Sequence, residues 1–181
     1  MDFQDLRECI HLEVIGERRK FTWRKVITRV MRHRRVRYVF WWRIAKYCHE
    51  KGGAWTKFAA KIDRMILDRY DVKIPLTVDI DKGLDIAYLT GVVIGHRVKI
   101  GKNFSVKPGV TIGLRGSFEE MDIRIGDNVT IGCNASILGG KVRIGDNVTI
   151  GAHALVMHDV PEDSIFITKF QSEIFPKKPE M

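Results

Sequence analysis

Two stretches of the chain share one pattern: Ile125–Ile137 reads IGDNVTIGCNASI, and Ile144–Val156 reads IGDNVTIGAHALV. In each, an aliphatic residue recurs every six positions, a small or apolar residue lies two positions before it, and Gly often follows it. A period of six fits neither a helix, with 3.6 residues per turn, nor a long amphipathic strand, with a period of 2. It predicts a short strand and a tight corner, repeated many times.

The six-residue period runs through most of the second half of the chain. Hexapeptide periodicity is typical of parallel β-helices, in which three hexads close one triangular coil. The thirteen aliphatic positions predict about four coils, and the Gly, Asn and Asp residues between them suit corners because they tolerate positive φ. The aliphatic positions are Ile74, Ile80, Ile86, Ile94, Ile100, Val106, Ile112, Ile125, Ile131, Ile137, Ile144, Ile150 and Val156.

Two interruptions break the period. Ile86 and Ile94 are eight residues apart, and Ile112 and Ile125 are thirteen apart. The longer interruption lacks the aliphatic pattern, so we expect a loop around 115–122 that projects from the coil. Insertions in repeat proteins lie on one face, often the binding face.

The N-terminal part has a different composition and predicts helices. Residues 21–49 contain no Gly or Pro, Gly52-Gly53 follows, and 54–70 has apolar residues at helical spacing. A third helix is expected at 2–15. We therefore divide the chain into a basic, aromatic helical region (1–71), a β-helix (72–163) and a C-terminal tail (164–181).

The net charge of +9 lies entirely in the helical region, because residues 1–71 hold 18 Lys and Arg against 9 Asp and Glu, whereas the rest holds 13 of each. Cations and aromatic residues gather at 20–49. Two interpretations stay open: this segment contacts an anionic membrane peripherally, or its aromatics pack on the β-helix or a neighbouring subunit. We expect no nucleic-acid partner, since no recognition motif accompanies the charge.

Several classes are excluded by composition. The longest apolar run near the N-terminus, 38–42, is far too short to span a bilayer, and no secretory signal is present. The three cysteines form no CxxC pair, so no metal site is predicted. We expect a cytoplasmic location, with peripheral contact at the inner face of the membrane as one interpretation of the basic segment.

Several motifs together resemble the left-handed β-helix (hexapeptide-repeat) acyltransferases, and most closely the serine O-acetyltransferase branch with the acetyltransferases of colanic acid and capsular polysaccharide clusters. The resemblance implies a homotrimer that binds acetyl-CoA in the groove between neighbouring β-helices. It also implies a His general base acting on an acceptor hydroxyl, with backbone amides stabilising the oxyanion. The motifs are GVVIG at Gly91–Gly95, GVTIG at Gly109–Gly113, IGDNVTIG at Ile125–Gly132, and Asp159-Val160-Pro161.

The ionisable residues of that family are replaced here. Ala87-Tyr88 occupies the place of its Asp-His pair, and the Asp that would orient this His falls near Lys73. Asp122 falls near the second family His. The base has therefore moved, or Tyr88 takes part directly, or the chain is a catalytically silent trimeric scaffold. Our catalytic candidates are Tyr88, Asp122 and His96, with Asp85, Glu119, Glu120 and His153 as further options for the base.

The resemblance also implies a path for acetyl-CoA. Gly113, Ala135 and Ala154 are small residues where the pantetheine arm of the family runs close to the backbone. Lys141, with Arg143, is a candidate for the CoA phosphates. The sequence thus predicts an O-acetyltransferase acting on a sugar or lipid-linked saccharide in surface polysaccharide biosynthesis, with serine O-acetyltransferase of cysteine biosynthesis as the alternative.

Overall fold

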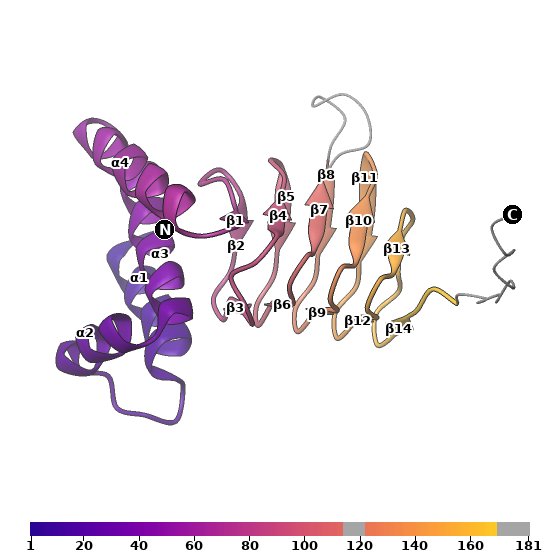
Figure 1. Cartoon of the computed structure of the whole chain (residues 1–181), viewed down its shortest axis with the longest axis horizontal. Coiled ribbons are helices and arrows are strands. Elements are labelled where there is room, and N and C mark those ends of the chain that lie inside the picture. Colours follow the sequence, from indigo (N-terminus) through magenta and orange to yellow (C-terminus); the bar gives the residue numbers. More distant parts are fainter. Residues whose placement is uncertain (114–121, 170–181) are drawn as a thin grey trace, which may run out of the picture.

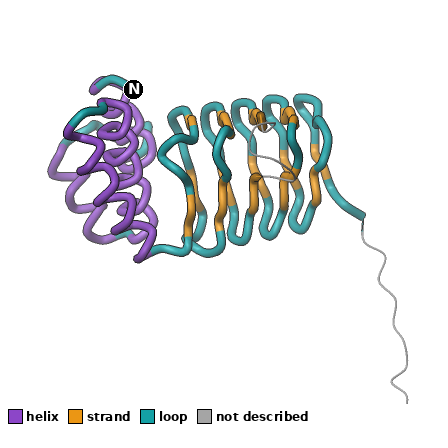
Figure 2. Tube along the Cα trace, turned by 90° about the horizontal axis from the view of Figure 1, so that it is seen from above, coloured by secondary structure: helices purple, strands orange, loops and turns teal. Residues whose placement is uncertain are grey.

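A computed structural model describes residues 1–113 and 122–169 of the chain. Helices gather at one end, and a regular stack of coils runs from them along the long axis of the molecule (Figure 1). Seen from above, the coils lie side by side with nearly equal spacing (Figure 2). The fold is a parallel β-helix, as the hexad period predicts, and it is left-handed, as the resemblance implies. An α-helical region precedes it.

The helical region begins with α1 (Phe3–Ile10), which continues into the π-helical turn η1 (His11–Ile15). Asp2 and Asp5 form a reciprocal capping box at the start of α1. The remaining helices are α2 (Trp23–Arg32), α3 (Arg34–Lys51) and α4 (Ala54–Arg69). Gly52 and Gly53 turn the chain between α3 and α4 with positive φ of 74° and 57°.

The prediction of one helix over 21–49 is wrong, because the chain breaks at His33, which is extended (φ −114°, ψ 114°). No Gly or Pro marks this break. Instead, the Arg37 guanidinium donates from Nε to the Val30 carbonyl at 2.8 Å and from Nη2 to the Met31 carbonyl. These are carbonyls that the end of α2 leaves without a helical partner. A side chain one turn into α3 thus caps α2.

The coil is built from three parallel sheets. Sheet A contains β1 (Val72–Lys73), β4 (Val92–Ile94), β7 (Thr111–Gly113), β10 (Ser136–Leu138) and β13 (Leu155–Val156). Sheet B contains β2 (Asp79–Ile80), β5 (Val98–Ile100), β8 (Asp122–Ile125) and β11 (Lys141–Ile144). Sheet C contains β3 (Asp85–Ile86), β6 (Ser105–Val106), β9 (Thr130–Ile131), β12 (Thr149–Ile150) and β14 (Ile165–Phe166).

Strand register confirms the interruptions in the hexad period. Partners in sheet A follow one another as Lys73, Val93, Thr111, Ser136 and Leu155, so successive coils are 20, 18, 25 and 19 residues long. The longest coil contains the predicted loop, of which residues 114–121 lie outside the described residues. The chain also forms β14 in the segment expected as a tail, because Thr149 pairs with Ile165.

Aliphatic side chains fill the coil. All thirteen hexad positions are buried, and the small or apolar residues two positions before them are buried as well. The coil passes from sheet A to B, from B to C, and from C to A at three corners, which we call the A–B, B–C and C–A edges.

The B–C edge is held by a polar ladder. Asn103, Asn128 and Asn147 have φ of 55° to 58°, which Asn tolerates better than most residues. Asn103 Nδ2 donates to Asn128 Oδ1 at 2.9 Å, and Asn128 Nδ2 donates to Asn147 Oδ1 at 2.9 Å. These amides link three successive coils, which explains the repeated Asp-Asn pairs in the sequence.

Helix α3 joins the helical region to the first coil. Trp42 Nε1 donates to the Ile74 carbonyl at 3.0 Å. The buried Arg43 pairs with Glu13 (Nη2 to Oε1, 2.6 Å) and donates to the carbonyls of Ile80 and Asp81, each at 2.7 Å. Packing on the β-helix therefore accounts for these α3 residues, whereas α2 packs mainly on α3 and η1.

Candidate active site

The A–B edge brings two catalytic candidates to one groove. His96 follows β4, and Asp122 opens β8 one coil later. Both line a cavity of about 530 Å³ together with Thr77, Arg97 and Lys99. The Thr77 hydroxyl lies 3.0 Å from His96 Nδ1, so it orients the imidazole ring at the rim of the groove.

Asp122 is held by two arginines. Its Oδ2 accepts from Arg143 Nη2 at 2.9 Å, and its Oδ1 accepts from Arg124 Nε at 3.0 Å. Hydrogen bonds from Arg143 and then from Arg124 hold the pKa of this carboxyl well below its usual range. A carboxylate that binds protons so weakly is a poor general base, but it orients both guanidinium groups along the groove.

Two of the cofactor candidates lie on the same edge. Gly113 ends β7 just before the undescribed residues 114–121, and Lys141 opens β11 directly beside Asp122 in register. The outer face of sheet B adds a row of cations on three successive strands, because Lys99 pairs with Arg124 and Arg124 pairs with Arg143, whereas the first strand has Asp79 in this row. Neighbouring strands lie about 4.8 Å apart, so the three cations form one continuous row, in which Arg124 and Arg143 both contact Asp122.

The sequence does contain a signal for Lys99 and Arg124, although neither was among the predicted site residues. Each stands between two inward aliphatic residues, in Val98-Lys99-Ile100 and Ile123-Arg124-Ile125. The strand period of 2 turns their side chains outward. Only the register between strands shows that they form one row with Arg143.

Tyr88 lies on a different edge. It belongs to the C–A corner between β3 and β4, and 69% of its surface is exposed. Sheet A separates it from His96, because Gly91–Gly95 crosses the face, a distance of roughly 13 Å at about 3.3 Å per residue. Within one chain, Tyr88 therefore cannot exchange a proton with the groove at the A–B edge.

Ala135 and Ala154 also lie at the C–A edge. Their side chains are buried in the coil interior, at 0% and 1% exposure. A ligand would meet only their backbone. His153 is exposed at this edge with φ of 57°, a corner position of the repeat.

The remaining alternatives for the base are of two kinds. Asp85 is engaged by Arg35 Nη1 at 2.5 Å and by the Ser105 hydroxyl at 3.2 Å. Glu119 and Glu120 lie outside the described residues. Within the described ranges, no group of three or more His, Cys, Asp or Glu side chains is placed to hold a metal ion.

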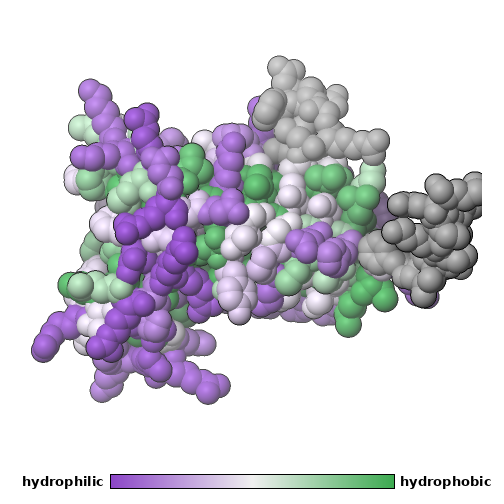
Figure 3. Space-filling view, in the orientation of Figure 1, coloured by the Kyte–Doolittle hydropathy of each residue, from purple (hydrophilic) through white to green (hydrophobic). Residues whose placement is uncertain are grey.

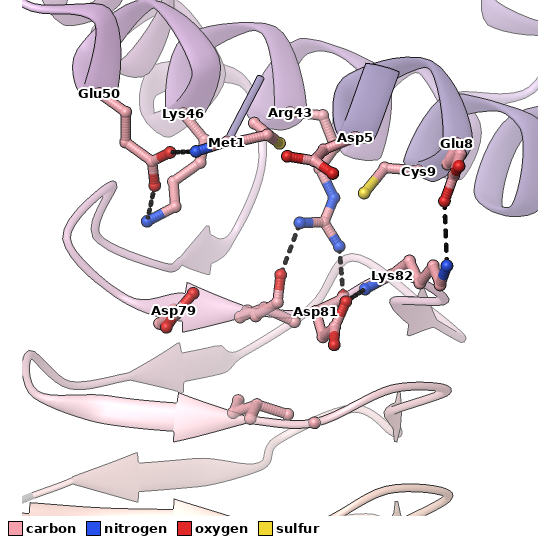
Figure 4. Close-up of a pocket in the computed structure, with 13 residues that line it drawn as sticks. Met1, Asp5, Glu8, Cys9, Arg43, Lys46, Glu50, Asp79, Asp81 and Lys82 are labelled. Atoms are coloured by element: carbon pink, nitrogen blue, oxygen red, sulfur yellow. Dashed lines mark hydrogen bonds and ion pairs between the residues drawn. The ribbon is translucent and has the colours of Figure 1, made fainter. Parts of the chain in front are cut away.

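A second polar cavity, of about 380 Å³, lies between the helices and the first coil (Figure 4). Most of its charged groups are paired with one another: Glu50 contacts Lys46 at 2.7 Å and the Met1 amine at 2.6 Å, and Glu8 contacts Lys82 at 2.9 Å. Ion pairs of this kind hold the helices against the first coil. We therefore place the candidate site at the edges of the coil and not in this cavity.

Comparison with known proteins agrees with the β-helix fold. The family model described as bacterial transferase hexapeptide (six repeats) matches residues 122–158. No curated protein matches the chain significantly in sequence.

Solved structures similar to this chain include several serine acetyltransferases. Isoform 3 from Entamoeba histolytica, in complex with cysteine, is 26% identical with a TM-score of 0.74, covering 95% of this chain and 62% of its own. The soybean enzyme complexed with serine is 27% identical with a TM-score of 0.75, covering 92% and 68%. A serine acetyltransferase in complex with CoA has 22% identity and a TM-score of 0.72, covering 92% and 68%.

The chain thus spans less than two thirds of the first of these proteins and about two thirds of the others. The matches extend over the helical region as well as the coil. They support the left-handed β-helix acyltransferase class, whereas the polysaccharide branch stays a prediction.

Proposed function

We propose that this protein is an acyl-CoA-dependent O-acetyltransferase. The observation that carries the proposal is the likeness to serine acetyltransferases over 90% or more of the chain at 26–28% identity, including both the helices and the coil. Two of these similar structures are complexes with serine. Serine is therefore the first acceptor to test.

A sugar hydroxyl is the second candidate acceptor, and Ala87-Tyr88 favours it. The resemblance implies an Asp-His pair at this place in a serine enzyme. Here the exposed Tyr88 offers a neutral phenol, which is a hydrogen-bond donor and acceptor without a carboxylate to hold an amino group. An acceptor that lacks a charged amine suits this edge better than serine does.

Acetyl-CoA is the proposed co-substrate. Gly113 leaves space beside Gly95. A Cβ atom added to Gly113 would lie 3.9 Å from the backbone of Gly95. Lys141 and the row Lys99, Arg124 and Arg143 supply the cations that phosphate groups need. The proposed path runs along the A–B edge, with the backbone of Ala135 and Ala154 at the edge of a neighbouring subunit.

A homotrimer would unite the two edges. After Lys73 in the first strand, the outer row of sheet A (Val93, Thr111, Ser136, Leu155) is uncharged, and so is most of that of sheet C (Ser105, Thr130, Thr149), whereas the row of sheet B is charged. Depletion of charge is typical of the core of an interface. We propose that the site is shared between subunits, with Tyr88 of one subunit facing His96 of the next and His96 as the general base.

The test separates binding from chemistry. Titration calorimetry with acetyl-CoA comes first, followed by thioester consumption with serine, or with nucleotide-linked and lipid-linked sugars, as acceptor. Turnover on serine supports the first acceptor and refutes the second. Turnover on a sugar does the reverse. Absence of binding at millimolar acetyl-CoA would refute both enzymes and leave the silent trimeric scaffold.

A further inference from the structure

Helix α2 exposes three large apolar side chains to solvent. Trp23, Ile27 and Met31 are four residues apart, and 48%, 58% and 70% of their surfaces are exposed. Residues at this spacing share one face of a helix, so they form a continuous row, here called the α2 row. Val26 and Val30 pack inward against the helical region, which fixes the row outward.

Cations surround the α2 row. From Arg18 to His49 the chain holds twelve Lys and Arg and no Asp or Glu. A space-filling view shows hydrophilic side chains gathered over the helical region, with a more mixed surface over the coil (Figure 3). Helix α2 itself contributes four of these cations beside the α2 row: Arg24, Lys25, Arg29 and Arg32.

Behind the row, a cleft of about 530 Å³ is lined almost entirely by basic side chains and by no carboxylate. The Nε atom of Arg29 is buried in this region and has no hydrogen-bond partner among the described residues. A buried donor without an acceptor is costly, and an anionic oxygen entering the cleft would satisfy it. The lining residues are Ile15, Arg19, Arg24, Lys25, Thr28, Arg29, Arg32 and His33.

We propose that α2 is the docking surface of this protein for an anionic membrane. Trp23, Ile27 and Met31 enter the boundary between headgroups and acyl chains, and the cations of the cleft bind lipid phosphates. An apolar row flanked by Lys and Arg is the pattern of helices that lie in the membrane interface. The proposal does not depend on the acetyltransferase activity.

The structure also narrows the segment that makes this contact. Tyr38, Trp42, Arg43 and Lys46 of α3 are buried, so they are not available to a membrane. Helix α2 packs on α3 and η1 and lies at the end of the molecule away from the coil stack (Figure 1). None of the described helices is long and apolar enough to cross a bilayer, which agrees with a contact at the surface.

Two other occupants fit less well. A second copy of α2 would bring Arg24, Lys25, Arg29 and Arg32 against their own counterparts, and like charges repel. A nucleic acid would pair with the cations but leave the α2 row without a function. Both are separate outcomes of the experiment.

The experiment is co-sedimentation of the full chain with vesicles of phosphatidylcholine alone or with phosphatidylglycerol added. Binding is expected only with the anionic lipid and should fall as salt rises. Arg24→Gln with Lys25→Gln should weaken binding about 30-fold, since each cation near the surface contributes about a fivefold factor. Ile27→Gln with Met31→Gln should weaken it about tenfold.

Helix α4 offers matched controls. Phe58 and Met65 are exposed to a similar extent, at 47% and 42%, and Lys57 and Lys61 are exposed cations. Their paired changes to Gln should leave vesicle binding unaltered. Trp fluorescence should shift to the blue on binding, and Trp23→Phe should abolish most of that shift. Far-UV circular dichroism and the thermal midpoint show that each variant folds.

Four results would overturn the proposal. One is no binding to anionic vesicles at low salt in a folded protein. Another is binding that the α2 and α4 variants weaken equally. The third is release of the vesicles by a short RNA, with the Ile27→Gln, Met31→Gln variant binding as tightly as the parent, which would point to a polyanion site. A concentration-dependent oligomer abolished by the same variant, without vesicle binding, would identify a second copy as the occupant.

Discussion

At the scale of single residues, the site contains replacements whose chemistry differs from that of the family it resembles. Tyr88, a neutral phenol, and Asp122, a carboxylate held by two arginines, stand where the resemblance implies His, and His96 is a candidate base at a separate position. Each therefore has a different expected role, which can be measured separately.

Asp122 should not act as the titrating base. Because hydrogen bonds from Arg143 and Arg124 lower the pKa of its carboxyl, it is already ionised throughout the working range of pH. The prediction is that Asp122→Asn changes the height of the profile of kcat/KM against pH but not its shape above about pH 5. Loss of an acid limb between about pH 5 and 8 in this variant would contradict the assignment.

Tyr88 should contact the acceptor and not CoA, because it lies at the C–A edge, away from the cations of sheet B. Tyr88→Phe removes one hydrogen bond, so we expect kcat with the acceptor to fall about two- to tenfold. The Kd for acetyl-CoA, measured by calorimetry, should not change. Tyr47→Phe in α3 is the control, and an unchanged rate in Tyr88→Phe would remove Tyr88 from the site.

At the scale of elements, the corner ladder stabilises the stack of coils. Asn128 has φ of 57° and bonds through its amide to Asn103 and Asn147. Asn128→Ala loses these bonds and strains the corner, so the free energy of unfolding should fall by about 2 kcal/mol. Asn128→Gly loses the same bonds without the strain, so its free energy of unfolding should fall by only about 1 kcal/mol. Urea unfolding measures both, and equal losses would show that backbone strain contributes nothing.

The buried pair of Arg43 and Glu13 fastens the helices to the first coil. Both side chains are almost fully buried, at 2% and 0% exposure, and Glu13 Oε1 also accepts from the amides of Gly83 and Leu84. Arg43→Met leaves a buried carboxylate without its cation and should destabilise by about 3–5 kcal/mol.

The matched control is Arg35→Met. Its pair with Asp85 is about half exposed on both sides, at 47% and 46%. Loss of an exposed pair should cost about 0–1 kcal/mol. Urea unfolding followed by circular dichroism compares the two variants, and equal costs would refute a special role for the buried pair.

At the scale of the whole molecule, the proposed site needs a partner chain, because Tyr88 and His96 lie on different edges of one coil stack. Thr111 lies in the middle of the uncharged row on sheet A, so Thr111→Arg places an unpaired charge in the proposed interface and should lower the trimer fraction. Lys99→Glu on sheet B is the control and should leave the mass unchanged. Analytical ultracentrifugation checks both, and a parent protein that is monomeric at all concentrations would refute the trimer.

The sequence by itself determined the coil. Inward aliphatic residues and Gly and Asn corners recur at a fixed period, and the two interruptions are local breaks in it. The conformation of each hexad can therefore be predicted from its own residues. The stack follows because neighbouring hexads bury the same face. The positions of the helices were also predictable, apart from the break at His33. This break depends on a side-chain cap from Arg37, and no Gly or Pro marks it in the sequence.

Only the tertiary structure decided which residues meet. It assigned Tyr88 to one edge and His96 with Asp122 to another, because the edge at which a residue lies depends on how many residues each coil contains, and three of the coils differ from 18 residues. It buried Arg43 and Lys46 and left the α2 row exposed, although all belong to one basic, aromatic segment. Burial is decided by contacts between elements far apart in the chain, which a periodic pattern cannot report.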